Sequence, residues 1–98
     1  MLFHVSATHS EDNCPMFRTE LMPDLLASRT DREEVERDAG VKVHFEVVDA
    51  PAHTVYALVE ADSVATVSRW FFSTPLRQHA EIRPVEDFND VIERAEAA

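Results

Sequence analysis

The chain has little of what marks disulfide-rich, nucleic-acid-binding or membrane-embedded proteins. Its one cysteine, Cys14, cannot form an internal disulfide, so nothing indicates an oxidising compartment. Nine Lys and Arg against 19 Asp and Glu leave a net charge of −10, which would repel phosphate backbones and anionic membranes. No apolar run approaches the ~18 residues of a membrane span, and the first 15 residues lack a basic signal-peptide region. We therefore expect a cytoplasmic protein with no nucleic-acid or membrane partner.

The rest of the composition is that of one folded domain. A chain of 98 residues can bury one hydrophobic core, and 45% hydrophobic with 29% charged residues is ordinary for globular proteins. The sequence has no internal repeat, no low-complexity tract and no Gly/Ser/Pro-rich linker. A single domain over residues 1–98 is predicted.

Four segments are predicted to be strands. Apolar and polar side chains alternate with a period of two in residues 2–8, 41–48 and 53–60, and residues 76–85 are expected to form the last strand. One side of the first three is wholly apolar and is expected to form the core: Phe3, Val5, Ala7, Val43, Phe45, Val47, Val55, Ala57 and Val59. The other side is mixed, with Leu2, His4, His44, Glu46, Tyr56 and Leu58.

Helices are expected between these strands. The first should start at Cys14-Pro15, be kinked or restarted at Pro23, continue from a cap at Thr30 and end at Gly40, the only glycine. A second helix should follow a cap at Asp62 or Ser63, with Trp70 and Phe71 in the core, and a short helix should close the chain from about residue 85. The order β-α-β-β-α-β-α predicts an α+β, ferredoxin-like antiparallel sheet with both main helices on one face and strand order 4-1-3-2.

Three segments, THSEDNCP, APAHTVYALVEAD and IRPVED, together with the length and element order, resemble the dimeric α/β-barrel superfamily. This group contains antibiotic-biosynthesis monooxygenases, muconolactone isomerases and stress-responsive barrel proteins, and the segments look most like one of its uncharacterised branches. The resemblance implies a homodimer whose two sheets face each other. It implies no reaction, because no catalytic motif of a named enzyme can be placed on these residues.

The predicted topology gathers His9, Cys14, His53 and His79 at one rim of the sheet. Imidazole and thiolate suit Zn²⁺, Cu or Fe²⁺, and three ligands leave a coordination position open for chemistry. We therefore interpret His9, Cys14 and His53 as candidate ligands of a divalent transition metal. The alternative is that these are surface histidines with polar partners.

Cys14 has a second interpretation as a reactive thiol at a helix N-terminus, where the helix dipole favours a thiolate. Glu11 and Asp12 would oppose that effect. The alternative is a small buried hydrophobic side chain.

The mixed sheet face offers His4, His44 and Tyr56, with Glu46, as candidate catalytic residues for proton transfer on a small molecule. The alternative is that they form hydrogen bonds across a dimer interface. Two functions therefore stay open: a homodimer that holds a small molecule or metal ion at the rim, with or without enzymatic turnover, and a non-catalytic assembly or stress-related binding module.

Overall fold

A four-stranded antiparallel sheet carries the fold. In the computed structural model, which describes residues 1–98, the strands are β1 (Leu2–Thr8), β2 (Lys42–Asp49), β3 (Thr54–Glu60) and β4 (His79–Val85). They lie in the order β2-β3-β1-β4, as predicted. The helices are α1 (Met22–Ala39), α2 (Val64–Phe71) and α3 (Phe88–Ala97), with the short 3₁₀ turns η1 (Glu11–Asn13) and η2 (Thr19–Leu21) before α1. This α+β arrangement is compatible with a ferredoxin-like fold.

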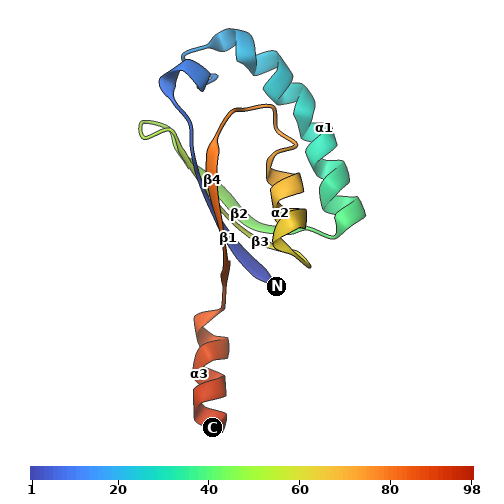
Figure 1. The fold of residues 1–98 in the computed structure, drawn as a ribbon, viewed down its shortest axis with the longest axis vertical. Helices are drawn as coiled ribbons and strands as arrows, with labels where there is room; N and C mark the ends of the chain where they lie inside the picture. Colours follow the sequence, from blue (N-terminus) through green and yellow to red (C-terminus); the bar gives the residue numbers. More distant parts are fainter.

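Helices α1 and α2 lie on the same side of the sheet, whereas α3 projects away from the rest of the molecule (Figure 1). We call the sheet face turned away from α1 and α2 the open face. None of the three helices combines the length and apolar character needed to cross a bilayer.

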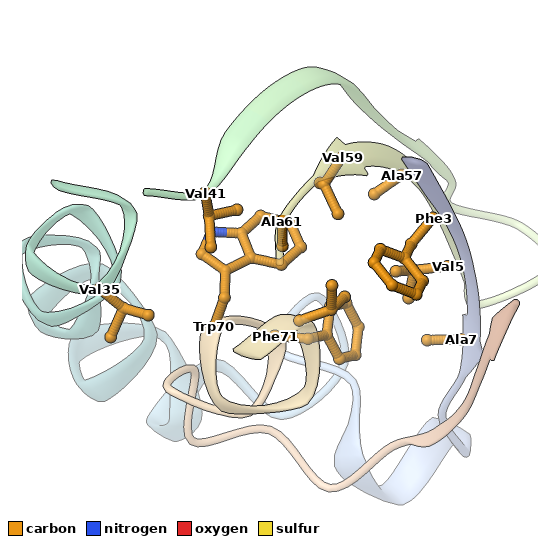
Figure 2. Packing of buried hydrophobic residues seen from close by; sticks show 11 residues of the cluster. Phe3, Val5, Ala7, Val35, Val41, Ala57, Val59, Ala61, Trp70 and Phe71 are labelled. Atoms are coloured by element: carbon orange, nitrogen blue, oxygen red, sulfur yellow. The ribbon is translucent and has the colours of Figure 1, made fainter. Parts of the chain in front are cut away.

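The core lies between the sheet and α2, as Figure 2 shows. Trp70 and Phe71 of α2 are 0% and 2% exposed, which confirms that this aromatic segment belongs to the core. The apolar sides predicted for the first and third strands are also confirmed, because β1 and β3 both contribute to the core cluster. The members of this cluster are Phe3, Val5, Ala7, Val35, Val41, Ala57, Val59, Ala61, Val67, Trp70 and Phe71.

Strand β2 contains a β-bulge. The pairing with β3 shifts between Val43, which lies opposite Val59, and Phe45, which lies opposite Leu58. His44 is therefore an extra residue on its strand. One inserted residue reverses which side chains of the rest of the strand face the core.

Beyond the bulge, Glu46 and Val48 face the helices, and Phe45 and Val47 lie on the open face opposite Leu58 and Tyr56. The Glu46 carboxylate forms a bidentate ion pair with Arg32 of α1, in which the two guanidinium nitrogens donate to the two carboxylate oxygens at 2.8 and 2.7 Å. The predictions that Phe45 and Val47 belong to the core and Glu46 to the other face were wrong. They assumed unbroken alternation along the strand.

Helix α1 begins later than predicted. Residues 14–21 form turns and η2, and Pro23 lies in the first turn of α1, where its missing N–H costs no helical hydrogen bond. Helix α1 therefore begins beside Pro23, which agrees with the predicted restart at this proline. The helix runs through Thr30 without interruption, so the start at Cys14-Pro15 and the cap at Thr30 were wrong. Gly40, with a φ of 70°, ends the helix in the left-handed conformation, as predicted.

The remaining boundaries differ by a few residues. The Ser63 hydroxyl accepts a hydrogen bond from the Thr66 N–H, which confirms the predicted cap of α2. Strand β4 starts at His79 rather than at residue 76, and α3 starts at Phe88 after a cap by Asp87.

Candidate metal centre

The β1–β3 register places His9 opposite His53. Thr8 pairs with Thr54, and the next residues continue the pairing, because the His9 N–H donates to the His53 carbonyl at 3.1 Å. The two imidazole rings meet edge to face with their centroids 5.3 Å apart. Sheet pairing alone therefore brings together two rings that lie far apart in sequence.

The loop after β1 supplies the thiol. Cys14 is 4% exposed, and its carbonyl accepts the N–H groups of Phe17 at 3.0 Å and Arg18 at 2.7 Å, which folds the loop tightly. The ligand atoms of His9, Cys14 and His53 all lie within 4.8 Å of one another. We call these three residues the triad. Phe17 packs on the outer side, with its ring centroid 5.5 Å from that of His53.

Cys14 does not sit at a helix N-terminus, because α1 begins only at Met22. The geometric reason for expecting a helix dipole to activate this thiol is therefore absent. What the structure provides instead is a buried sulfur facing two imidazoles.

The triad is close to metal-binding geometry. A tetrahedral zinc ion with Zn–N of about 2.05 Å and Zn–S of about 2.3 Å separates its donor atoms by about 3.4–3.6 Å. Since the donor atoms lie within 4.8 Å of one another, they need to approach by about 1.2–1.4 Å at most, within reach of side-chain rotations. The group fits a transition metal without a change of backbone.

Three imidazole nitrogens of the triad are buried and make no hydrogen bond: both nitrogens of His9 and Nδ1 of His53. Buried polar atoms in proteins are nearly always partnered, and leaving one without a partner costs about 1–3 kcal/mol. A bound metal ion would give each imidazole a partner.

Burial lowers the pKa of His9, the Gln78 carboxamide beside it raises the pKa, and His53 lowers it further. The Gln78 oxygen nevertheless makes no hydrogen bond of good geometry with the ring. The balance favours the neutral imidazole, which is the form that binds metals.

Gln78 was not singled out in the sequence, although strand register contains the signal. Thr8 pairs with His79 in β4, so the preceding residue, Gln78, lies beside His9. His79 itself is exposed and points to the other face of the sheet. His79 therefore lies at the predicted rim, but its side chain faces away from the triad and does not join it.

The hairpin between β2 and β3 holds His53 in place. His53 has a φ of 52°, a left-handed conformation that is uncommon outside glycine but is adopted by histidine more often than by most residues. Its N–H donates to the Ala50 carbonyl at 3.1 Å, which closes the turn.

The structure separates the candidate catalytic residues of the open face. His4 and Tyr56 are neighbours, with ring centroids 6.2 Å apart. His44, displaced by the bulge, pairs through Nε2 with Glu60 Oε1 at 2.9 Å, and this contact lowers the pKa of Glu60. Glu46 lies on the other face, so these residues form two pairs rather than one cluster. Their catalytic role stays a prediction.

Comparisons with known proteins identify the family and the fold. A family model described as "Domain of unknown function (DUF3303)" matches residues 1–98. A solved structure of a Streptomyces coelicolor A3(2) protein has 20% identity and a TM-score of 0.53, covering 87% of this chain and 96% of that one. A structure from Agrobacterium tumefaciens has 12% identity and a TM-score of 0.46, covering 90% and 96%. No curated protein matches the chain.

Proposed function

The chain belongs to the DUF3303 family, a domain of unknown function, and from this starting point we propose that it binds a divalent transition metal ion through the triad. One observation carries the proposal: the buried, unpartnered nitrogens of His9 and His53 lie together with the buried Cys14 thiol. Two imidazoles and a thiolate suit Zn²⁺, Cu or Fe²⁺. Three protein ligands leave one position for water or a small molecule, so the site allows both simple binding and turnover.

We propose that residues 1–98 act as one cytoplasmic domain that assembles as a homodimer, as in a dimeric α/β barrel. Phe45, Val47 and Tyr56 are 41%, 52% and 38% exposed on the open face. Phe88 of the projecting α3 is 75% exposed. The radius of gyration is 15.4 Å, against about 13 Å for a compact chain of this length. A second copy would cover these apolar surfaces.

The alternative function is a non-catalytic assembly or stress-related binding module. The exposed apolar residues of the open face and the projecting α3 favour it, because both serve assembly without any metal. The metal measurement below separates the two functions.

The first prediction concerns metal binding. Protein purified without a histidine tag and reloaded with Zn²⁺ should hold about one ion per chain. Cys14→Ser and His53→Ala should each weaken binding at least tenfold, because each removes a direct ligand. Equilibrium dialysis with elemental analysis measures the affinity, and Co²⁺ loading should give a thiolate charge-transfer band that Cys14→Ser abolishes.

His79→Ala is the matched control, since its imidazole is exposed on the other face and should leave binding unchanged. Circular dichroism should confirm that all variants are folded. Equal metal content in wild type and Cys14→Ser, or none in any preparation, would contradict the proposal and favour the assembly module.

A further inference from the structure

An apolar cavity of about 400 Å³ adjoins the triad and shares His9 and Cys14 with it. Most of the remaining wall is hydrophobic and comes from α1, β2 and the segments around α2: Met22, Leu25, Leu26, Val48, Phe71 and Leu76. This volume is in the range of small-molecule sites, which are mostly apolar with a few polar groups. At the roughly 30 Å³ that each water occupies in the liquid, it has room for about a dozen non-hydrogen atoms.

Helix periodicity and the bulge together create the cavity. Met22, Leu25, Leu26 and Arg29 recur on one face of α1. The bulge turns Val48 toward that face. Leu26 and Val48 nevertheless remain 54% and 62% exposed, so these apolar side chains line a space that they do not fill.

The charged part of the wall is net positive in a chain of net charge −10. It contains Arg29, Arg32 and Glu46. Glu46 holds Arg32 through two hydrogen bonds, and the Arg32 guanidinium lies 4.1 Å from the centre of the Trp70 ring. Arg29 makes no ion pair, so its charge is free to attract an anion.

We propose that this cavity binds a small organic anion, a carboxylate with an apolar body. The body would lie against Leu25, Leu26 and Val48, and the carboxylate would be attracted by Arg29. The inference extends the proposed function, because a metal held by the triad would lie in the wall of the same cavity. The apolar and cationic groups of the cavity are present whether or not the ion is bound.

The test uses octanoate as the probe and octylammonium, of equal length and opposite charge, as its control. Calorimetric titration of metal-free protein should show octanoate binding at least tenfold more tightly than octylammonium. The fluorescence of Trp70, the only tryptophan, should respond to the same titration, because the guanidinium of Arg32 lines the cavity and also lies over the Trp70 ring.

Two pairs of variants locate the binding. Val48→Trp should abolish octanoate binding by filling the cavity, whereas Val64→Trp, at a similarly exposed valine outside the cavity, should not. Arg29→Gln should weaken octanoate binding about fivefold, which is the change in affinity expected when one exposed ion pair is lost. Arg29→Lys should restore the binding, because it keeps the positive charge. Arg37→Gln, on the same helix but outside the cavity, should have no effect.

Repeating the titration with Zn²⁺-loaded protein separates this inference from the metal proposal. Octanoate binding that is lost in Val48→Trp supports the cavity even if no preparation holds metal. Metal binding without octanoate binding overturns the inference and leaves the metal site intact. Equal binding of octylammonium, or binding unaffected by Val48→Trp, also overturns it.

Discussion

At the scale of single residues, the strongest signal is a conflict between burial and hydrogen bonding at His9. Its two ring nitrogens are buried without partners, and burial is the main cause of its lowered pKa. The neutral imidazole is kept away from water even though its nitrogens gain no hydrogen bond in return. Such a conflict is typical of a group that binds something.

The second prediction is a pH dependence of the metal-free protein. Because the pKa of His9 is lower in the folded protein than its ordinary value of 6.5, the unfolded chain binds more protons between these two pKa values. The contribution of His9 to the free energy of unfolding is therefore favourable above about pH 6.5 and is lost as the pH falls through the lowered pKa. Urea unfolding at about pH 7.5 and about pH 5.5 should show a smaller loss of stability in His9→Asn than in wild type.

The exposed His79 provides the comparison, and His79→Asn should keep the wild-type pH dependence. If His9→Asn loses as much stability on acidification as the wild type, burial of this imidazole is not responsible.

At the scale of elements, the bulge at His44 determines which side chains of β2 face α1. It turns Glu46 toward the helices, where the carboxylate pairs with Arg32. The pair is half-buried, with side chains 20% and 30% exposed, and it joins β2 to α1 beside the cavity. A second bidentate ion pair, between Arg94 and Glu86, is exposed to solvent. It connects α3 only to the residue that follows β4.

The third prediction compares these two ion pairs. Glu46→Gln should destabilise the protein by about 1–2 kcal/mol, because Arg32 would remain half-buried over Trp70 without its counter-charge. Glu86→Gln removes the same type of contact in water and should leave the free energy of unfolding nearly unchanged. Urea denaturation of both variants measures the difference, and equal effects would show that burial of the Arg32 pair does not matter.

At the scale of the whole molecule, the isolated chain leaves large surfaces uncovered. Helix α3 extends away from the sheet (Figure 1). On the open face, Tyr56 pairs with Val47, and Phe45 lies nearby on the same strand as Val47. The longest dimension is 55 Å and the shortest is 17 Å. A second copy that covers the open face would make the particle more compact.

The fourth prediction concerns mass in solution. Light scattering should give twice the 11.1 kDa of one chain for the wild type. Tyr56→Glu should give a single-chain mass, because a charge on the open face would be buried without a partner. Thr30→Glu, exposed on α1, should leave the mass unchanged. A wild type with single-chain mass, or a Tyr56→Glu variant that keeps the wild-type mass, argues against this interface.

The sequence alone determined the order of elements, the apolar sides of the first and third strands, and the helix ends at Gly40 and Ser63. These depend on side-chain period and on local backbone chemistry, which are readable along the chain. The gathering of His9, Cys14 and His53 was also predictable, because the connection rules for strands limit which loops share a rim.

Only the tertiary structure decided the extra residue at His44, the orientation of Glu46 and the separation of His79 from the triad. A bulge shifts the pairing register of one strand relative to its neighbour. The apolar and polar pattern of one strand does not show where that shift occurs. The cavity beside the triad is likewise a space between α1 and β2, so it depends on how far apart packing holds those elements rather than on any single segment.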